Sequence, residues 1–170
     1  FSADFAIGSV DGNTSSEKVV TAYGYQIDLS TSFTGEDAFS VSLDAGAGGE
    51  DAKALGELDL NDGGDGLTVD GITYSFPVGD KLTVLVGDST DGSALYSTAC
   101  VYGGFTNTLD DCGNYSSAFT TTGSNSVGFS ASYDIGNGFT GAIGYAGSGT
   151  AATGLMASGT DYYGGQLTYT

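Results

Sequence analysis

The sequence ITYSFPVGDKLTVLVG, residues 72–87, decides the fold. It contains two runs in which large apolar residues alternate with mostly smaller ones, separated by the turn-forming sequence Pro-Val-Gly-Asp. Alternation with a period of two on both sides of a Pro/Gly/Asp cluster is typical of a β-hairpin. The hairpin is therefore predicted to have one apolar face and one small, mostly polar face. The large residues that share the apolar face are Ile72, Tyr74, Phe76, Leu82, Val84 and Val86.

Outward from this hairpin, the same alternation predicts eight strands. They cover residues 1–10, 19–30, 38–45, 67–76, 81–87, 126–133, 139–145 and 162–170. The pattern of the fourth strand slips by one residue near Asp70-Gly71, as a β-bulge would cause. Short connections at 31–37, 77–80 and 134–138 alternate with long ones at 11–18, 46–66, 88–125 and 146–161. Outer-membrane barrels are built in this way, with short periplasmic turns and longer external loops.

The fold class expected from these patterns is all-β: an up-and-down antiparallel transmembrane β-barrel, with residues 1–170 as a single barrel region. A soluble β-sandwich would show a similar alternation. However, a 38-residue loop is uncommon in a compact soluble domain, and the small face lacks a cover of Lys and Glu. Aromatic residues at the short connections and along the apolar face fit a lipid-facing girdle. These candidates are Phe33, Phe39, Phe76, Tyr133, Phe139, Tyr23 and Tyr25.

Composition excludes several classes of function. The net charge is −18 with three Lys and no Arg, so no positive patch is available for nucleic acid. No run approaches 18 apolar residues, which argues against a membrane-spanning helix. The chain has no His to serve as the base for a nucleophile and no Trp to form a sugar platform. We therefore expect no enzymatic activity.

The small face supplies the residues expected to line a pore. They are too small to fill the interior of a closed eight-stranded barrel, so a wider, water-filled barrel is expected. Its missing strands would come from chain outside these residues or from other copies in a homo-oligomer. An acidic wall favours cations, so we expect a mild cation preference, with the 88–125 connection folded inward to narrow the pore. The pore-lining candidates are Asp4, Asp28, Asp44, Gln26, Ser40, Ser42, Ser130 and Ser132.

Cys100 and Cys112 are predicted to form a disulfide, which implies an oxidising compartment. An acidic stretch offers a weak calcium candidate with oxygen donors from Asp59, Asn61, Asp65 and Asp70. It departs from a helix-loop-helix calcium loop because Gly63 and Asp70 occupy two of the ligand positions and a strand follows. The stretch is thus expected to be a solvated acidic loop first and a weak cation site second. No other cofactor is expected.

Three segments resemble the outer-membrane porins of cyanobacteria. They are TSFTGED at residues 31–37, the hairpin at 72–87, and GFSASYDIGNGFTGAIGYAG at 128–147. Those porins resemble the carbohydrate-selective porins and usually carry an N-terminal surface-layer-homology domain. The resemblance covers the early strands of such a barrel. It implies an outer-membrane location, contact with outer-membrane lipids, and passive diffusion of small hydrophilic solutes or inorganic ions. The constriction Arg common in that family is absent here, which speaks against anion or sugar specificity.

The alternative function is structural. A secreted or surface-displayed β-rich protein could assemble with itself as a fibre or a coat by adding sheet to sheet at open strand edges. The two functions differ in where the large apolar side chains point: toward lipid in a porin, and into a protein core in a fibre or coat protein.

Overall fold

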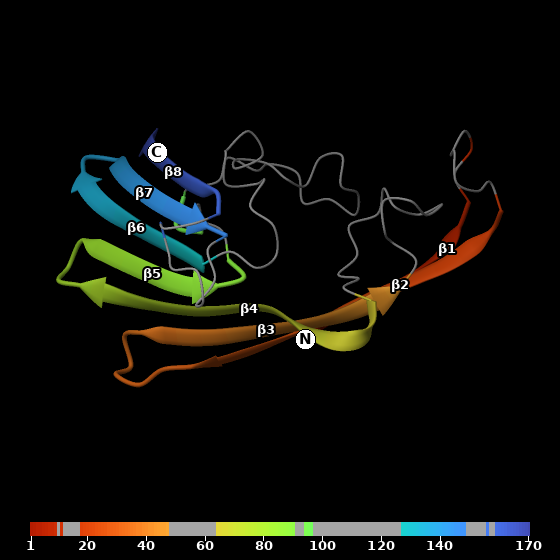
Figure 1. Ribbon diagram of the computed structural model, residues 1–170. Coiled ribbons are helices and arrows are strands. Elements are labelled where there is room, and N and C mark those ends of the chain that lie inside the picture. Colours follow the sequence, from red (N-terminus) through yellow and green to blue (C-terminus); the bar gives the residue numbers. More distant parts are fainter. Residues whose placement is uncertain are drawn as a thin grey trace. The chain divides into compact units, whose positions relative to one another are not determined.

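The computed structural model describes residues 1–9, 11, 18–47, 64–90, 94–96, 127–148, 156 and 159–170. These residues form eight β-strands and no helix (Figure 1). None of the described residues belongs to a helix that is long and apolar enough to cross a bilayer. The strands are β1 (Ser2–Gly8), β2 (Val20–Thr31), β3 (Ala38–Ala47), β4 (Gly64–Val78), β5 (Leu82–Asp88), β6 (Val127–Gly136), β7 (Phe139–Gly147) and β8 (Asp161–Tyr169).

The strands form one sheet in the order β1-β2-β3-β4-β5-β6-β7-β8, so each strand pairs with its neighbours in the sequence. The pairings between β1 and β2 and between successive strands from β4 to β8 are all antiparallel. The predicted all-β, up-and-down arrangement of eight strands is therefore confirmed. Within the described residues β1 and β8 are the two edges, so the sheet is open and the predicted closure into a barrel is not seen there.

The hairpin that the sequence placed at residues 72–87 is formed by β4 and β5. Its register pairs Ile72 with Asp88 and Val78 with Leu82, and the connecting turn is Gly79 to Lys81. Gly79 has a φ of 65°, a left-handed conformation that glycine adopts without steric cost. The turn is thus shorter than the predicted connection at 77–80, because pairing continues through Pro77 and Val78.

The hairpin between β6 and β7 has a two-residue turn at Asn137 and Gly138, with φ values of 56° and 83°. Two successive left-handed residues form the tight turn that matches the twist of the flanking strands, and Asn-Gly is the preferred pair for it. A register shift between Asp134 and Gly136 precedes the turn. Most of the predicted five-residue connection at 134–138 therefore belongs to the strand pair.

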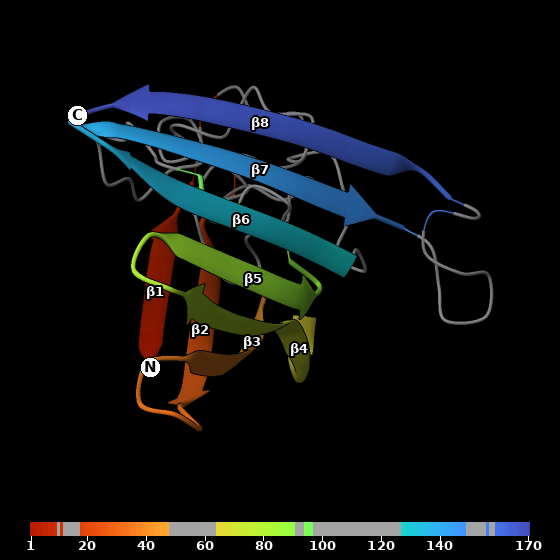
Figure 2. The ribbon, with the colours of Figure 1, turned by 90° about the vertical axis from the view of Figure 1, so that its left-hand side faces the viewer.

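The described residues divide into two compact units. Residues 1–29 and 42–70 form the first, which holds β1, most of β2, and the parts of β3 and β4 next to the long connections. Residues 30–41, 71–96 and 127–170 form the second, which holds β5 to β8 and the turn-side parts of β2, β3 and β4. Figure 2 shows β5, β6, β7 and β8 of the second unit side by side.

The β4–β5 hairpin depends on close approach of its backbones at Gly87. A Cβ at this position would lie 2.6 Å from the Ile72 carbonyl oxygen and 2.7 Å from Thr90 Cγ2. We predict that Gly87→Ala lowers the free energy of unfolding by about 1–3 kcal/mol, because the extra methyl group must displace the paired strand. Urea unfolding followed by far-UV circular dichroism measures this change.

Gly66→Ala is the matched control, because a Cβ at Gly66, on the partner strand β4, meets no heavy atom within 4 Å. A loss of stability at Gly66 as large as that at Gly87 would contradict the steric explanation.

Candidate functional site

The two faces of the sheet in the second unit carry different kinds of side chain. On one face, cross-strand pairing aligns Phe129 with Tyr145 and Tyr145 with Tyr163. On the other face, Ser130 pairs with Gly144, which pairs with Gly164. The alternation that the sequence showed along each strand is thus continued across the strands, producing one apolar face and one small, mostly polar face.

Exposure at most positions of these strands runs opposite to that of a soluble sheet, although Tyr145 on the apolar face and Leu85, which pairs with Ser130 on the small face, are both buried. On the apolar face Phe129 is 37% exposed, Ile143 61% and Leu167 68%. On the small face Ser130 and Ala146 are 0% exposed. Soluble antiparallel sheets bury the apolar face and leave the polar face in water. A contiguous exposed apolar surface indicates contact with a partner or a membrane.

The small face contacts part of the long connection between β5 and β6. The Leu95 backbone N–H donates to Ser130 Oγ at 3.3 Å, and Ser130 Oγ donates to the Ile143 carbonyl oxygen at 3.3 Å. Of the two pore-lining candidates on β6, Ser130 is therefore buried beneath a described piece of the 88–125 connection, whereas Ser132 is half-buried. Sequence periodicity gave the face of Ser130 but not this cover, because the cover comes from a distant segment.

The other pore-lining candidates lie on β1, β2 and β3. Asp28 accepts from Ser42 Oγ at 2.7 Å and from Gln26 Nε2 at 3.0 Å. Asp44 accepts from Thr68 Oγ1 at 2.7 Å. The structure thus brings Gln26, Asp28 and Ser42 into one hydrogen-bonded group. It also links Asp44 to Thr68 on β4. Asp4 lies exposed on β1, opposite Gly24, and Ser40 donates to Ser30 at 3.2 Å in the second unit.

Asp70 belongs with these carboxylates, although the sequence assigned it only to a weak calcium site. Its carboxylate interacts electrostatically with Asp44 and Asp28. The alternation along β4 shifts by one residue at Asp70-Gly71, so the sequence pattern did not show on which face of the sheet the Asp70 side chain lies. Hydroxyl and amide groups donate the hydrogen bonds to Asp28 and Asp44, so the carboxylates are solvated by neutral donors.

The calcium and disulfide predictions concern mostly other parts of the chain. Asp59, Asn61, Cys100 and Cys112 lie outside the described residues. Asp65 lies on β4 and accepts from the Tyr23 hydroxyl at 3.0 Å. The part of the chain that the structure describes has no group of three or more acidic, Cys or His side chains that could hold a metal ion.

Asp37, just before β3, holds the β2–β3 turn together. Its Oδ1 accepts from the Ser32 and Thr34 hydroxyls at 2.6 and 2.7 Å and from the Phe33 and Thr34 backbone N–H groups at 3.0 and 2.8 Å. Its Oδ2 accepts from the Tyr74 hydroxyl at 2.8 Å. The side-chain hydrogen bonds from Ser32 and Thr34 hold the pKa of Asp37 well below its usual range. The sequence analysis missed this residue.

This turn gathers the aromatic residues predicted for the girdle. Phe33 is 72% exposed, and its ring centroid lies 6.1 Å from the centroids of both Phe39 and Tyr74. Tyr74 lies 5.4 Å from Phe76 in turn. The carboxylate of Asp37 therefore fixes both the backbone that carries Phe33 and the hydroxyl of Tyr74. Tyr74 was predicted for the apolar face but not as a girdle residue.

The remaining girdle candidates lie in three other places. Phe139 contacts Tyr169 with ring centroids 4.8 Å apart at the turn end of β7 and β8, and Tyr133 lies beside a groove on the same face. Tyr25 contacts Phe1 at 6.2 Å, and Tyr23 binds Asp65. At the loop end of β7, Tyr145 donates to Asp161 at 2.7 Å and contacts Tyr163 at 5.2 Å. Aromatic rings with polar partners thus occur near both ends of the apolar face.

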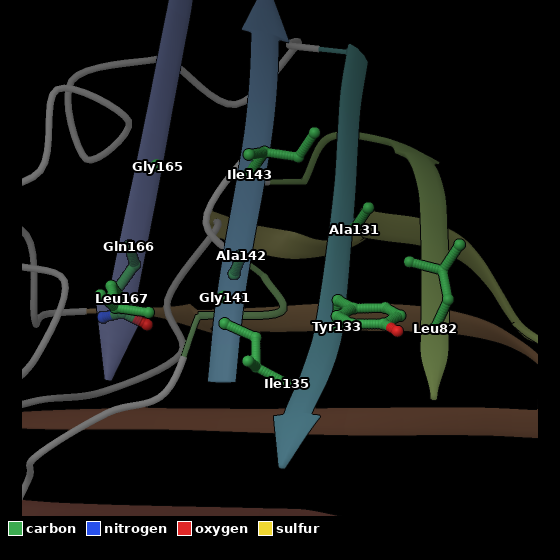
Figure 3. A pocket seen from close by; sticks show the side chains of 10 residues that line it. All are labelled: Leu82, Ala131, Tyr133, Ile135, Gly141, Ala142, Ile143, Gly165, Gln166 and Leu167. Carbon is green, nitrogen blue, oxygen red and sulfur yellow. The ribbon is translucent and has the colours of Figure 1, made fainter. Parts of the chain in front are cut away.

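A groove of about 570 Å³ opens on the apolar face of the second unit (Figure 3). Gly141 and Gly165 contribute no side chains to it, while Tyr133, Ile143 and Leu167 form its sides. The complete lining is Leu82, Ala131, Tyr133, Ile135, Gly141, Ala142, Ile143, Gly165, Gln166 and Leu167.

The hydrogen bonds to Asp37 predict a specific acid sensitivity. Because its pKa is lower in the folded chain than in the unfolded chain, the charged carboxylate stabilises the fold above the unfolded pKa, near 4. This contribution is lost as the pH falls below that value toward the folded pKa. We predict that Asp37→Asn lowers the midpoint of urea unfolding at pH 7. The midpoint of the variant is also expected to fall less between pH 5 and pH 2 than that of the unaltered chain.

Glu36→Gln serves as the control, since Glu36 is the exposed neighbour in the same turn. If the urea midpoint of Asp37→Asn fell between pH 5 and pH 2 as steeply as that of the unaltered chain, the Asp37 carboxylate would not be the source of the acid sensitivity.

Comparison of the chain with family models, with curated proteins and with solved structures gives no match. The resemblance to cyanobacterial porins therefore rests on the three segments quoted above, and the function is argued from the geometry of the sheet.

Proposed function

We propose that this chain forms part of the wall of an outer-membrane β-barrel through which small hydrophilic solutes or inorganic ions diffuse passively. The observation that carries this proposal is the reversed exposure of the sheet, with Ile143 and Leu167 more than half exposed on one face and Ser130 and Ala146 fully buried on the other. An outward apolar face and an inward polar face are what a barrel in lipid requires.

The lengths of six of the eight strands are sufficient for the same conclusion. β3 and β6 have ten residues each, β7 and β8 have nine, and β2 and β4 have 12 and 15, whereas β1 and β5 have seven each. A tilted strand needs about 9–11 residues to cross the hydrocarbon core. The aromatic groups near the two ends of the apolar face, around Phe33 and around Tyr145, suit the two girdles that flank such a band.

The open edges indicate how the barrel would be completed. In hydrocarbon, each backbone N–H or C=O group left without a hydrogen bond costs several kcal/mol, so an open edge is not tolerated. Side chains such as Ser130, Ala142 and Gly144 are too small to fill a closed eight-stranded barrel. We infer that β1 and β8 pair with further strands, from chain outside residues 1–170 or from other copies, to enclose a wider aqueous lumen.

The carboxylates of the small face determine the ion preference of this lumen. Asp28, Asp44 and Asp70 lie close enough to interact electrostatically, and in an aqueous pore they would lower the energy of cations and repel anions. We propose a mild cation preference with no enzymatic step. No resident cofactor is needed for passive diffusion.

The proposal is tested with the protein at its natural length. A porin requires detergent for extraction and gives stepwise conductance in planar bilayers. A protein that stays soluble without detergent and never conducts would contradict the proposal.

The acidic wall gives a sharper prediction. In a gradient of potassium chloride, the reversal potential is expected to show cation preference. At about 8 Å in water one charge lowers the energy of a cation and raises that of an anion by roughly 0.5 kcal/mol each, so we predict that Asp44→Asn lowers the cation-to-anion permeability ratio about fivefold at low salt. Asp65→Asn is the control, since Asp65 binds Tyr23 of the apolar face and its charge does not face the lumen. Anion preference in the unaltered protein would overturn the assignment.

One observation favours the alternative function, a self-assembling fibre or coat protein at the cell surface. In the described part of the sheet, the edges at β1 and β8 carry no Pro and no Lys, the residues that commonly protect sheet edges from association. Such a protein would assemble in detergent-free buffer, and its apolar faces would be covered by other copies.

A further inference from the structure

We propose that a polar pocket on the small face, at the turn end of β5 and β6, binds a small zwitterion of the amino-acid type. Lys81 binds the carboxylate of this solute, and Asp80 and Asp134 bind its ammonium group. The inference rests on the proposed function, because that function places the small face in the lumen. It deepens the function by naming a class of solute that the pore holds.

The cross-strand register places the pocket on the small face. The Asp134 backbone N–H donates to the Lys81 carbonyl oxygen at 2.9 Å, so Lys81 lies opposite Asp134, which pairs in turn with Thr140. In the next row of the same face, Thr83 pairs with Ser132. Residues directly opposite each other share one face of an antiparallel sheet. One ammonium group, one carboxylate and three hydroxyls therefore lie together on the face assigned to the lumen.

The size of the pocket limits the solute to a small one. Its volume is about 230 Å³, below the usual range of small-molecule sites, about 300–1,000 Å³. A water molecule takes up about 30 Å³ in the liquid, so the pocket has room for roughly seven non-hydrogen atoms. The smaller amino acids are of this size.

Opposite charges lie close together around Gly136. Lys81 Nζ lies 3.9 Å from the position that a Cβ of Gly136 would occupy, and Asp134 Oδ1 accepts from the Gly136 backbone N–H at 2.8 Å. Asp80, in the β4–β5 turn, adds a second carboxylate to the pocket lining. Among the described residues of the second unit, Lys81 is the only cationic side chain. The pocket therefore presents both signs of charge to a solute.

This charge pattern favours a zwitterion over other small solutes. Two carboxylates repel an anion, and a cation that binds them is repelled by the ammonium group beside them. An uncharged polyol can bind the hydroxyls but leaves the charges unused. An exposed Lys–Asp pair contributes little stability, so a solute that binds both groups can replace their mutual attraction. In exchange it forms charge-assisted hydrogen bonds at both of its ends.

Isothermal titration of the natural-length protein in detergent tests the site with four solutes of nearly equal size. Serine carries both charges, serinol only the ammonium group, glycerate only the carboxylate, and glycerol neither. We expect serine to bind at least tenfold more tightly than each of the other three. Serine binding that is undetectable, or no tighter than that of serinol or glycerate, would overturn the proposal.

Two variants assign the two ends of the solute. Lys81→Gln is expected to weaken serine binding at least tenfold without weakening serinol binding. Asp134→Asn is expected to weaken serine binding at least tenfold without weakening glycerate binding. Because each variant keeps its affinity for one of the two probes, loss of binding through misfolding is distinguished from loss of a charge contact. Unchanged serine affinity in both variants would overturn the assignment.

Asp88→Asn is the matched control for the change in net charge. Asp88 lies at the opposite end of β5 and pairs with Ile72, which places it on the other face. We expect this variant to keep its serine affinity within twofold. A loss as large as that in Asp134→Asn would overturn the pocket, since binding would then follow only the total charge.

The conductance of the unaltered protein in planar bilayers is recorded separately. A protein that conducts potassium chloride but shows no preference for serine would overturn the zwitterion site and leave the porin proposal intact. A protein that binds serine through Lys81 and Asp134 but never conducts would overturn the porin proposal and leave the site intact.

Discussion

The structure depends on one constraint, which is that every strand must place its large apolar side chains on the same side of a single sheet. Antiparallel pairing aligns Phe129, Tyr145 and Tyr163 on one face, and Ser130, Gly144 and Gly164 on the other. Water would favour burial of the first face and exposure of the second. For most of these residues the observed exposure is the reverse: Phe129 and Tyr163 are 37% and 64% exposed and Ser130 is fully buried, whereas Tyr145 departs from the trend and is buried.

Aromatic residues contact carboxylates at both ends of the strands. At the turn end, Asp37 accepts five hydrogen bonds and holds Phe33 and Tyr74 within one aromatic group. At the loop end, Tyr145 donates to Asp161. In both places an aromatic ring keeps its apolar body on the large face and directs its hydroxyl to a carboxylate. Rings with one apolar and one polar end are favoured where hydrocarbon meets water.

Residues with a small side chain or none produce both the small face and the groove. Glycine on the apolar face, as at Gly141 and Gly165, leaves a depression between large neighbours. On the opposite face, Ser130 leaves room for the backbone of Leu95 to approach the sheet. Small or absent side chains thus leave a groove on one face and allow a contact with the long connection on the other. An open sheet with unpaired β1 and β8 edges needs additional strands before either face can serve a transport function.

The sequence by itself determined the strand count, the up-and-down order and the two faces, because alternation with a period of two is local and repeats in all eight strands. It also identified most of the aromatic residues at the turn end, since they lie beside the short connections. It could not give the site fully. Asp70 was concealed by the parity slip beside Gly71, Asp37 depends on Tyr74, which is 37 residues away, and the cover of Ser130 comes from Leu95. Only the tertiary structure decided these contacts and the open edges, because they depend on cross-strand register and long-range hydrogen bonds that a local pattern does not specify.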